Sequence, residues 1–453
     1  MSDIGNRAHI IVSTSRAQIT DADTINCVIG HDLTIDPRAL EDYCAVLLRD
    51  IEHDLVVVCG VVAFADRVIR RRRASGWARD IEATIPVCEL EAWQQASVQA
   101  ALVDALELVT GDNWRFNFIP GGVRTTVKQS SLDFSSGPYV ILPSSEGMDS
   151  YLQWQLLKVQ EPGSAVLRIQ TSNRATNEKR NRAIDAEGTS RDQRLRLPIS
   201  AKVGTHPEPS YRTRTFLYFC MAALAAVKAQ SRRVIIGENG VGALGPSMIR
   251  YGNEAPHRTS HPAFTRRLQT FLNGLLGSDL AFEHPQIFRT KGEVLTLATG
   301  LGISGWEKTN SCVRGTRDKL GNMSCGACSG CLLRRTAILA AGLKPTGFFW
   351  ETLGARSLDE ARLNPEAREA TRNDLEILHH GAHAMAELAG LACLDADADV
   401  FQRAAWDLNG PVRTGLDETA RDINRLVKAH ADEWGRFQDY FGPSNVLNLE
   451  QVG

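Results

Sequence analysis

The chain has 453 residues, in which 51 Lys and Arg residues nearly balance 53 Asp and Glu residues. Hydrophobic residues make up 43% and charged residues 23%, which is the composition of a globular protein with room for about two to four domains. The near-neutral balance argues against a nucleic-acid-binding protein, and the N-terminus lacks the pattern of a secretory signal. We therefore expect a cytoplasmic protein without a membrane span, whose thiols stay reduced.

Residues 1–135 are predicted to form an α+β accessory domain. Amphipathic patterns predict helices over residues 38–51 and 89–109. Apolar runs predict strands over residues 8–14, 54–64, 80–87 and 114–120. A stretch rich in Gly, Ser and Gln at residues 121–138 is typical of a domain boundary.

Residues 136–345 are predicted to form a doubly wound parallel sheet of the α/β class, because short apolar strands alternate with helical or loop segments. The predicted strands are residues 139–144, 165–172, 194–200, 233–237 and 281–287. The apolar stretch at residues 215–227 is too short to span a bilayer and is predicted to be a buried helix. Residues 346–453 are rich in Ala, Leu, Glu and Arg, and we expect a helical C-terminal region there.

A first candidate site follows the first of these strands. The segment YVILPSSEGMDS passes from a strand that ends at Pro143, through a short loop, to a helix predicted to begin near Asp149. A loop that leads into a helix N-terminus presents unpaired backbone N–H groups, which suit an anion. The residues that could add space and hydroxyl donors are Ser144, Ser145, Gly147 and Ser150. A helix cap beside an incidental Ser and Asp cluster explains the same residues equally well.

Four of the ten cysteines lie within SCVRGTRDKLGNMSCGACSGC, at Cys312, Cys325, Cys328 and Cys331. Four thiolates at this spacing can complete a tetrahedral zinc shell with no position left for water, which makes such a site structural. An iron–sulfur cluster, four unligated thiols and a redox pair remain alternatives, although a redox pair needs no third or fourth cysteine.

The loop at residues 145–150 resembles the S-G-G-x-D-S loop of the PP-loop ATP pyrophosphatases, which have the adenine nucleotide alpha hydrolase-like fold. Those enzymes hold the pyrophosphate of ATP at this loop while AMP is moved onto an acceptor. One position departs from the pattern, because Glu146 stands where that family usually has glycine. A carboxylate beside a triphosphate is unfavourable unless it points away or meets Mg²⁺.

The loop and the cysteine spacing together resemble the QueC family of 7-cyano-7-deazaguanine synthases. Other pieces of that family's pattern follow in the same order: Arg212 and Arg214 at a helix start, Gly237-Glu238-Asn239 at a strand end, and Lys291 at a further helix start. The resemblance covers roughly residues 139–343, which is under half of the chain. Longer QueC-like chains with an extra N-terminal domain occur in antiphage defence, and this chain resembles most the QatC component of the Qat system.

The resemblance implies an ATP-dependent ligase that adenylates a 7-deazapurine carboxylate and forms an amide or a nitrile, with ATP, Mg²⁺ and Zn²⁺ as cofactors. It implies catalytic roles for Asp149, Ser150 and Lys291. It implies ATP binding by Ser144, Ser145, Gly147, Asp149, Ser150, Arg212 and Arg214, and substrate binding by Gly237, Glu238 and Asn239. The zinc ligands would be Cys312, Cys325, Cys328 and Cys331.

The flanking regions, which small-molecule synthases lack, favour a macromolecular amine acceptor, such as the N-terminus of a protein from the same defence operon. We expect residues 1–135 to dock this partner, with the basic stretch at residues 67–73 as an exposed surface for it. A homodimer stays open, and neither a membrane nor a nucleic acid is expected as a partner.

Two other functions stay open. Some PP-loop relatives modify tRNA bases, but the charge balance and the lack of a cysteine suited to sulfur transfer argue against that function. Glu146 motivates a non-catalytic nucleotide-binding scaffold of a defence complex. The G-x-G-x-x-G run at residues 240–245 is interpreted as a substrate-facing loop, since no unbroken helix follows it. The histidines of HHGAH at residues 379–383 are interpreted as a surface or packed pair on a helix.

Overall fold

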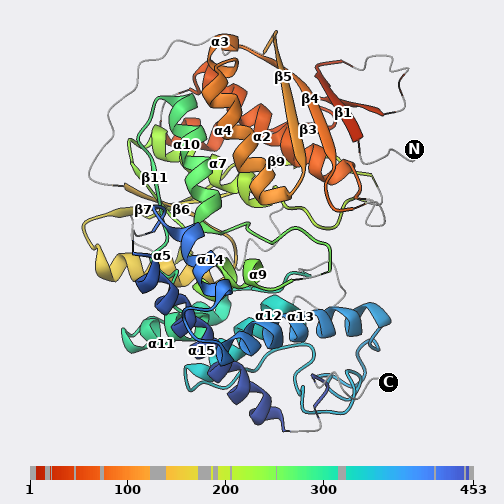
Figure 1. Cartoon of the computed structure of the whole chain (residues 1–453), viewed down its shortest axis with the longest axis vertical. Coiled ribbons are helices and arrows are strands. Elements are labelled where there is room, and N and C mark those ends of the chain that lie inside the picture. The colour runs from red at the N-terminus through yellow and green to blue at the C-terminus, as the bar shows by residue number, and fades with distance from the viewer. Residues whose placement is uncertain are drawn as a thin grey trace.

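The computed structural model describes residues 7–15, 21, 23–44, 47–71, 76–122, 139–171, 185–186, 192–204, 207–250, 252–314, 323–412, 415–442 and 445–447. The N-terminal sheet lies at one end of the long axis and the C-terminal helices at the other, with a central sheet between them (Figure 1). Among the described helices, none qualifies as a candidate for crossing a membrane.

The central sheet has five parallel strands in the order β11-β10-β6-β7-β8. The first of them in the chain, β6, lies in the middle, so the chain proceeds outward in both directions, as in a doubly wound sheet. The prediction of a parallel sheet is confirmed, with the bounds β6 Tyr139–Pro143, β7 Ala165–Gln170, β8 Gln193–Arg196, β10 Arg233–Ile235 and β11 Ala281–Glu283. Ligands bind such sheets where the strand order reverses, which here lies between the carboxyl ends of β6 and β10.

Helices cover both faces of this sheet. Ile141 and Leu167 belong to one core, with helices α7 (Arg214–Lys228) and α10 (Pro262–Leu276). Val140 and Leu142, which point to the other face, belong to a second core, with α5 (Met148–Gln160) and α11 (Lys291–Gly300). The buried helix predicted at residues 215–227 is confirmed as α7.

The N-terminal region contains a second parallel sheet, whereas the sequence suggested an α+β arrangement. Its strands follow the order β2-β1-β4-β5, and each neighbouring pair is parallel. Three predicted strands are confirmed as β1 (Arg7–Ser13), β4 (Asp80–Val87) and β5 (Asn113–Pro120), and β2 (Thr24–Val28) is an additional strand. The short strands β3 (Leu33–Ile35) and β9 (Ile199–Ala201) pair antiparallel and connect this region with the central one.

The strand predicted at residues 54–64 is wrong, because this run forms the middle of helix α2 (Asp50–Val68). Every residue from 54 to 66 is buried, and an apolar run that is buried on all sides does not distinguish a strand from a helix. Glu52 caps the start of this helix, since its carboxylate accepts from the Arg49 N–H at 2.7 Å. The predicted helices are shorter or divided, as α1 (Arg38–Cys44), α3 (Leu90–Trp93) and α4 (Ala96–Thr110).

One hydrophobic core extends from the N-terminal sheet into the central sheet. Helix α2 packs against α7, and α4 packs against α10, so helices from the two regions lie face to face. The same group of buried side chains includes Ile10 and Ile81 of the N-terminal sheet and Ile141 of the central sheet. The N-terminal region therefore covers apolar surface of the central region that water would otherwise reach.

A buried ion network lies at this junction. Arg79 is 0% exposed, and its guanidinium donates to Asp66 (2.6 Å) and to Asp112 (2.6 Å). Arg71 also donates to Asp112 (2.8 Å). The Asp66 carboxylate in turn accepts from the Thr213 N–H at 2.9 Å, directly before α7. The network therefore ties the N-terminal sheet to the start of α7.

Among the described residues, the basic stretch at residues 67–73 is only in part the exposed surface that the sequence suggested. Arg71 is buried in the ion network, whereas Arg70 is exposed. Arg67 is half-buried, with its guanidinium 4.7 Å from the ring centroid of Tyr211. Residues 72 and 73 lie outside the described residues. A run of arginines in a sequence does not show which of them face water and which neutralise buried carboxylates.

Helices make up the C-terminal region, as predicted. The main ones are α13 (Arg372–Gly390), α14 (Asp399–Leu408) and α15 (Leu416–Phe441), and α15 packs against α13, α14 and α12 (Ser329–Ala340). On α13, His379 and His383 lie one helical turn apart, and His379 is partly buried whereas His383 is exposed. The short helices are α8 (Gly240–Ala243), α9 (Gly245–Met248), η2 (Trp306–Lys308) and η4 (Leu391–Cys393).

Replacing Arg79 by Leu removes the cation between two buried carboxylates. We expect Arg79→Leu to lower the free energy of unfolding by about 3–5 kcal/mol, because it leaves buried charge less well compensated. Arg70→Leu, at an exposed arginine of the same basic run, should change it by less than about 0.5 kcal/mol. Chemical denaturation measures both values, and equal stability of the two variants would contradict the role of the network.

Candidate functional site

The candidate site lies where the strand order of the central sheet reverses. The loop at residues 144–147 follows β6, and residues 236–239 follow the neighbouring strand β10. The Ser144 N–H donates to the Ile169 carbonyl at the end of β7 (2.8 Å), which fixes the start of the loop. The predicted loop and the predicted strand-end segment thus meet at one edge of the sheet.

The loop folds back on its own hydroxyl groups. The Ser150 hydroxyl lies within donating distance of the carbonyls of Ser145 (3.1 Å) and Gly147 (3.2 Å), and the Gly147 N–H donates to the Ser145 hydroxyl (3.0 Å). Helix α5 begins at Met148, and its N-cap residue, Gly147, provides no side-chain cap. The first turn of α5 therefore presents backbone N–H groups in an arrangement that suits an anion.

Asp149 is the centre of a group of charged and polar side chains. Its Oδ2 lies 2.7 Å from Lys291 Nζ, and its Oδ1 accepts from Asn239 Nδ2 at 3.0 Å. The same amide nitrogen donates to Glu238 Oε1 at 2.9 Å. The structure thus brings together predicted residues from three segments, namely the loop, the strand end after β10 and the start of α11. We refer to Asp149, Glu238, Asn239 and Lys291 as the Asp149 group.

Lys291 reaches Asp149 from a rigid position. It is the first residue of α11, and its side chain is only 5% exposed. Thr290 caps the helix, since its hydroxyl accepts from the Glu293 N–H (3.0 Å) while its own N–H donates to the Glu293 carboxylate (2.8 Å). Because both bonds of this capping box are formed, the backbone from which the ammonium extends is fixed.

Glu238 stays protonated near neutral pH in this setting. Burial and the negative charge of Asp149 raise the pKa of its carboxyl to about 8, and the opposing effect of Lys291 is smaller. The carboxyl also lies against the backbone of Gly242, where a Cβ would lie 2.2 Å from Glu238 Oε1. The group then carries one negative charge, on Asp149, opposite the one positive charge of Lys291.

Glycine permits the close approach of the strand end to α5. A Cβ at Gly237 would lie 2.8 Å from Gln153 Cβ and 3.2 Å from the Asp149 carbonyl oxygen. The G-x-G-x-x-G run follows at residues 240–245, and the two helices that begin in it, α8 and α9, have four residues each. Asn239 caps this short helix, since its Oδ1 accepts from the Gly242 N–H at 3.1 Å.

Arg212 and Arg214 lie at the start of α7, where the structure gives them other partners. The Arg212 guanidinium donates to Glu254 (3.3 Å) and lies 4.8 Å from the ring centroid of Trp77. The Arg214 Nε donates to the Tyr218 hydroxyl at 3.3 Å. Within the described ranges, no hydrogen bond or ion pair joins either arginine to the Asp149 group. Their role toward a phosphate therefore stays a prediction.

The four predicted ligand cysteines converge on one point. Their sulfur atoms all lie within 4.8 Å of one another, with 3.8 Å between Cys325 and Cys331 and 3.9 Å between Cys312 and Cys328. Sulfur atoms bound tetrahedrally to zinc at 2.3 Å lie about 3.8 Å apart, so the group fits such an ion.

Asn310 ties the cysteine segment to the loop, and sequence reasoning gave it no role. Its N–H donates to the Glu146 carbonyl (2.7 Å), and its side-chain oxygen accepts from the Cys312 N–H (2.9 Å) and from the Ser324 hydroxyl (2.9 Å). The cysteine segment therefore supports one side of the loop. A single asparagine before a cysteine carries little signal, because asparagine is frequent in turns of every kind.

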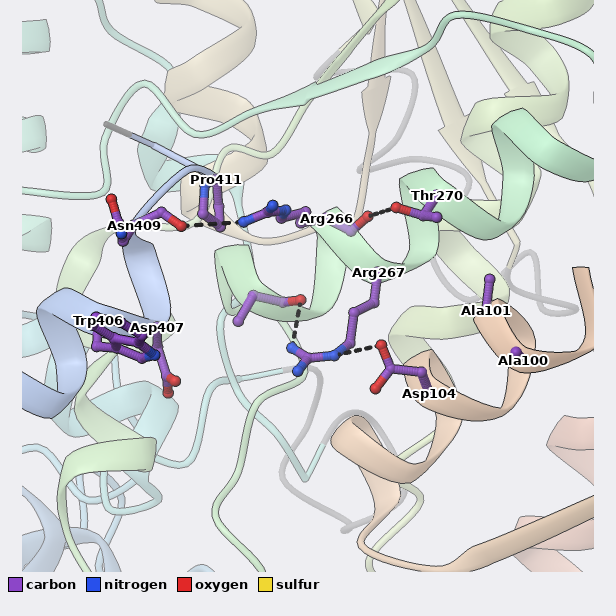
Figure 2. Close-up of a pocket in the computed structure, with 11 residues that line it drawn as sticks. Ala100, Ala101, Asp104, Arg266, Arg267, Thr270, Trp406, Asp407, Asn409 and Pro411 are labelled. Carbon is purple, nitrogen blue, oxygen red and sulfur yellow. Dashed lines mark hydrogen bonds and ion pairs between the residues drawn. The ribbon is translucent and has the colours of Figure 1, made fainter. Parts of the chain in front are cut away.

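An open cavity of about 770 Å³ lies elsewhere, between α4, α10 and α14 (Figure 2). Arg267 pairs there with Asp104 (2.8 Å), and Arg266 donates to the Asn409 carbonyl (3.1 Å). The lining includes the exposed Trp406 but no residue of the Asp149 group and none of the four cysteines. This cavity is therefore distinct from the candidate site.

Comparison with known proteins points to the central region. Residues 212–342 match the family described as "Queuosine biosynthesis protein QueC". Over 132 residues the chain is 35% identical to the 7-cyano-7-deazaguanine synthase of Trichodesmium erythraeum (strain IMS101), which is 29% of this chain and 53% of that protein. The chain thus spans about half the length of this relative. The family match includes Asn239, Lys291 and the four cysteines, and the loop at residues 144–150 lies before it.

Cys328→Ser removes one of the four sulfur ligands. We expect the wild-type protein to contain about one zinc ion per chain and the variant to lose both metal and solubility, since metal binding contributes to folding. Cys393→Ser, at an exposed cysteine outside the cluster, should keep both. Elemental analysis measures the metal content, and fresh wild-type protein with neither zinc nor iron would refute the metal site.

The pKa of Glu238 predicts how stability depends on pH. Between the ordinary value of 4.5 and the folded value of about 8, the folded protein keeps a proton that the unfolded chain has released. The free energy of unfolding should therefore fall as pH rises through this window, by at most about 1.4 kcal/mol per pH unit. Glu238→Gln should flatten this fall, and Glu107→Gln, at an exposed carboxylate, should not. Denaturation at several pH values tests this, and equal slopes for all three proteins would argue against it.

Proposed function

We propose that this chain is a QueC-like ATP-dependent ligase that joins a carboxylate to an amine and releases AMP and pyrophosphate, since residues 212–342 match the QueC family. The observation that carries the proposal is the meeting of Asp149, Asn239 and Lys291 at the reversal point of the sheet. Asn239 and Lys291 belong to the family domain, and Asp149 belongs to the loop that resembles a PP-loop. If the loop at residues 144–150 served only as a helix cap, it would not need the buried Lys291 ammonium beside Asp149.

The proposed reaction has two steps. A carboxylate oxygen of the substrate attacks the α-phosphorus of ATP, and the bond to pyrophosphate breaks, which leaves an acyl-adenylate. An amine then attacks the acyl carbon, loses a proton and displaces AMP to give an amide. The protein supplies mainly orientation and charge stabilisation for both steps.

The residues of the site suit these tasks. The N–H groups at the start of α5, with the hydroxyls of Ser144 and Ser145, would receive pyrophosphate oxygens, and the Lys291 ammonium would offset their charge. Asp149 would hold Mg²⁺, which withdraws charge from phosphate oxygens when bound. The four cysteines would hold a structural zinc ion, because they leave no open coordination position.

The strand-end segment would contact the substrate. A protonated Glu238 can donate a hydrogen bond to an acceptor atom of a base, which an ionised carboxylate cannot do. Gly237 lies between Glu238 and the sheet, and Asn239 holds Glu238 by the hydrogen bond to its Oε1. These features support a role for residues 237–239 in recognising a planar heterocycle.

For the carboxylate we propose a 7-deazapurine acid, because the protein from Trichodesmium erythraeum that this chain resembles is a 7-cyano-7-deazaguanine synthase. The product is then an amide or, after a second activation, a nitrile. The resemblance to QatC leads us to propose a role in antiphage defence, with the N-terminal amine of a partner protein as acceptor. The regions that flank residues 136–345 would give such a partner a surface to bind, which a synthase that uses free ammonia would not need.

With ATP, Mg²⁺ and a 7-deazapurine carboxylic acid, the purified protein should release AMP and pyrophosphate. Asp149→Ala and Lys291→Ala should each lower turnover by at least about 100-fold, because each removes a charge at the phosphates. Lys344→Ala, at an exposed lysine, serves as control. Glu146→Gly should keep or raise nucleotide affinity, since it removes a negative charge near the loop.

A coupled pyrophosphate assay and calorimetry separate the outcomes. Nucleotide binding by the wild type without pyrophosphate release would favour a non-catalytic scaffold. Turnover that survives in both the Asp149 and the Lys291 variants would place the reaction at another site.

A further inference from the structure

The C-terminal helix α15 touches one side of the candidate site through Leu426. A Cβ at Gly240 would lie 2.2 Å from the Ile287 carbonyl oxygen and 2.6 Å from Leu426 Cδ2, so the Leu426 side chain packs against the backbone of Gly240. Gly240 follows Asn239 directly, and its N–H donates to the Arg289 carbonyl (2.8 Å), two residues before Lys291. Leu426 therefore lies against the backbone that carries Asn239.

The same helix touches the other side of the site through Glu433. Leu426 and Glu433 are two helical turns apart and lie on one face of α15. A Cβ at Gly292, the residue after Lys291, would lie 2.4 Å from Glu433 Oε1. One face of α15 thus contacts the backbone beside Asn239 and the backbone beside Lys291.

Glu433 also controls the cap from which Lys291 extends. It is 5% exposed, and its Oε1 accepts from the Thr290 hydroxyl at 2.5 Å. A hydroxyl has one proton to donate, so donating it to Glu433 leaves the Thr290 lone pairs free to accept from the Glu293 N–H. Glu433 therefore fixes the direction in which Thr290 caps α11.

Arg425, on the same helix, adds a second bond to this helix start. Its guanidinium donates to Glu293 (2.5 Å) and to the Phe288 carbonyl. Glu293 is the other half of the capping box at Thr290. Both halves of the box that positions Lys291 are therefore bonded to α15.

We propose that α15 is a positioning element of the catalytic site, and that Glu433 is a positioning residue which sets the place of the Lys291 ammonium opposite Asp149. This inference rests on the proposed function, in which Lys291 offsets phosphate charge. Helix α15 spans Leu416–Phe441, outside the family match at residues 212–342. The C-terminal region thus supports the site through the cap of α11.

Two substitutions at Glu433 separate positioning from packing. Glu433→Gln keeps the Oε1 acceptor for Thr290, so turnover should stay within about threefold of the wild type. Glu433→Leu keeps a similar volume without the acceptor, and kcat for pyrophosphate release should fall at least about tenfold at saturating ATP. Asp432→Leu, at the exposed neighbour on α15, should leave kcat unchanged. The folded fraction of each variant is measured by circular dichroism at the assay temperature, so that kcat is compared per folded molecule.

Thr290 provides an independent test if Glu433→Leu folds poorly. Thr290→Val removes the hydroxyl that donates to Glu433, whereas Thr290→Ser keeps it. We expect Thr290→Val to lose turnover and Thr290→Ser to keep it. Thr290→Val removes the bond to Glu433 and also the acceptor for the Glu293 N–H. The double variant Thr290→Val with Glu433→Leu should therefore be no slower than Thr290→Val alone, because the bond that Glu433→Leu removes is already absent in Thr290→Val. Equal kcat per folded molecule in the wild type and Glu433→Leu, or fully additive losses in the double variant, would overturn the proposal.

Calorimetry with ATP and Mg²⁺ distinguishes failure of this inference from failure of the proposed function. A wild type that binds ATP but releases no pyrophosphate would refute the ligase, and the positioning role would still predict at least about tenfold weaker ATP binding by Glu433→Leu. A wild type that binds no ATP would refute both. Turnover in the wild type with unchanged kcat and affinity in Glu433→Leu would refute the positioning role alone.

Discussion

The ion pair between Lys291 and Asp149 is the interaction on which the candidate site depends. It joins residues 142 positions apart in the chain at 2.7 Å. The two side chains are 5% and 20% exposed, so water screens their attraction less than it would at the surface. A buried charge without its partner lowers the stability of the fold. The surrounding structure must therefore keep the backbones of Lys291 and Asp149 at the distance that the ion pair requires.

Different parts of the chain meet that requirement. The loop that carries Asp149 is bonded through Asn310 to the cysteine segment, and a metal ion there would make this support rigid. The helix start that carries Lys291 is bonded to α15 of the C-terminal region. The N-terminal region shares one core with α7 and α10, so it stabilises the central sheet in addition to any docking role. A domain that could be removed without cost would not share its core in this way.

The sequence predicted best those features that local pattern determines. Short apolar strands with polar ends gave the central sheet, and the spacing of the cysteines gave the cluster at Cys312 to Cys331. The sequence was a weaker guide to features that depend on contacts between residues distant in the chain. The run at residues 54–64 is buried on all sides, so its apolar pattern could not distinguish the helix that it forms from a strand. Arg71 is buried because it pairs with Asp112, which is distant in the chain. Asn310 and Glu433 are ordinary polar residues in the sequence, and their roles come from partners that are distant in the chain.

Hydrogen–deuterium exchange of the full-length protein, with and without ATP and Mg²⁺, tests the central claim most directly. If ATP binds where the strand order reverses, exchange should slow together in three separate segments, at residues 145–150, 237–242 and 290–294. These segments contain the loop, the strand end and the cap of α11. Slowing confined to the helices that line the cavity in Figure 2, or no slowing in these three segments, would contradict the account.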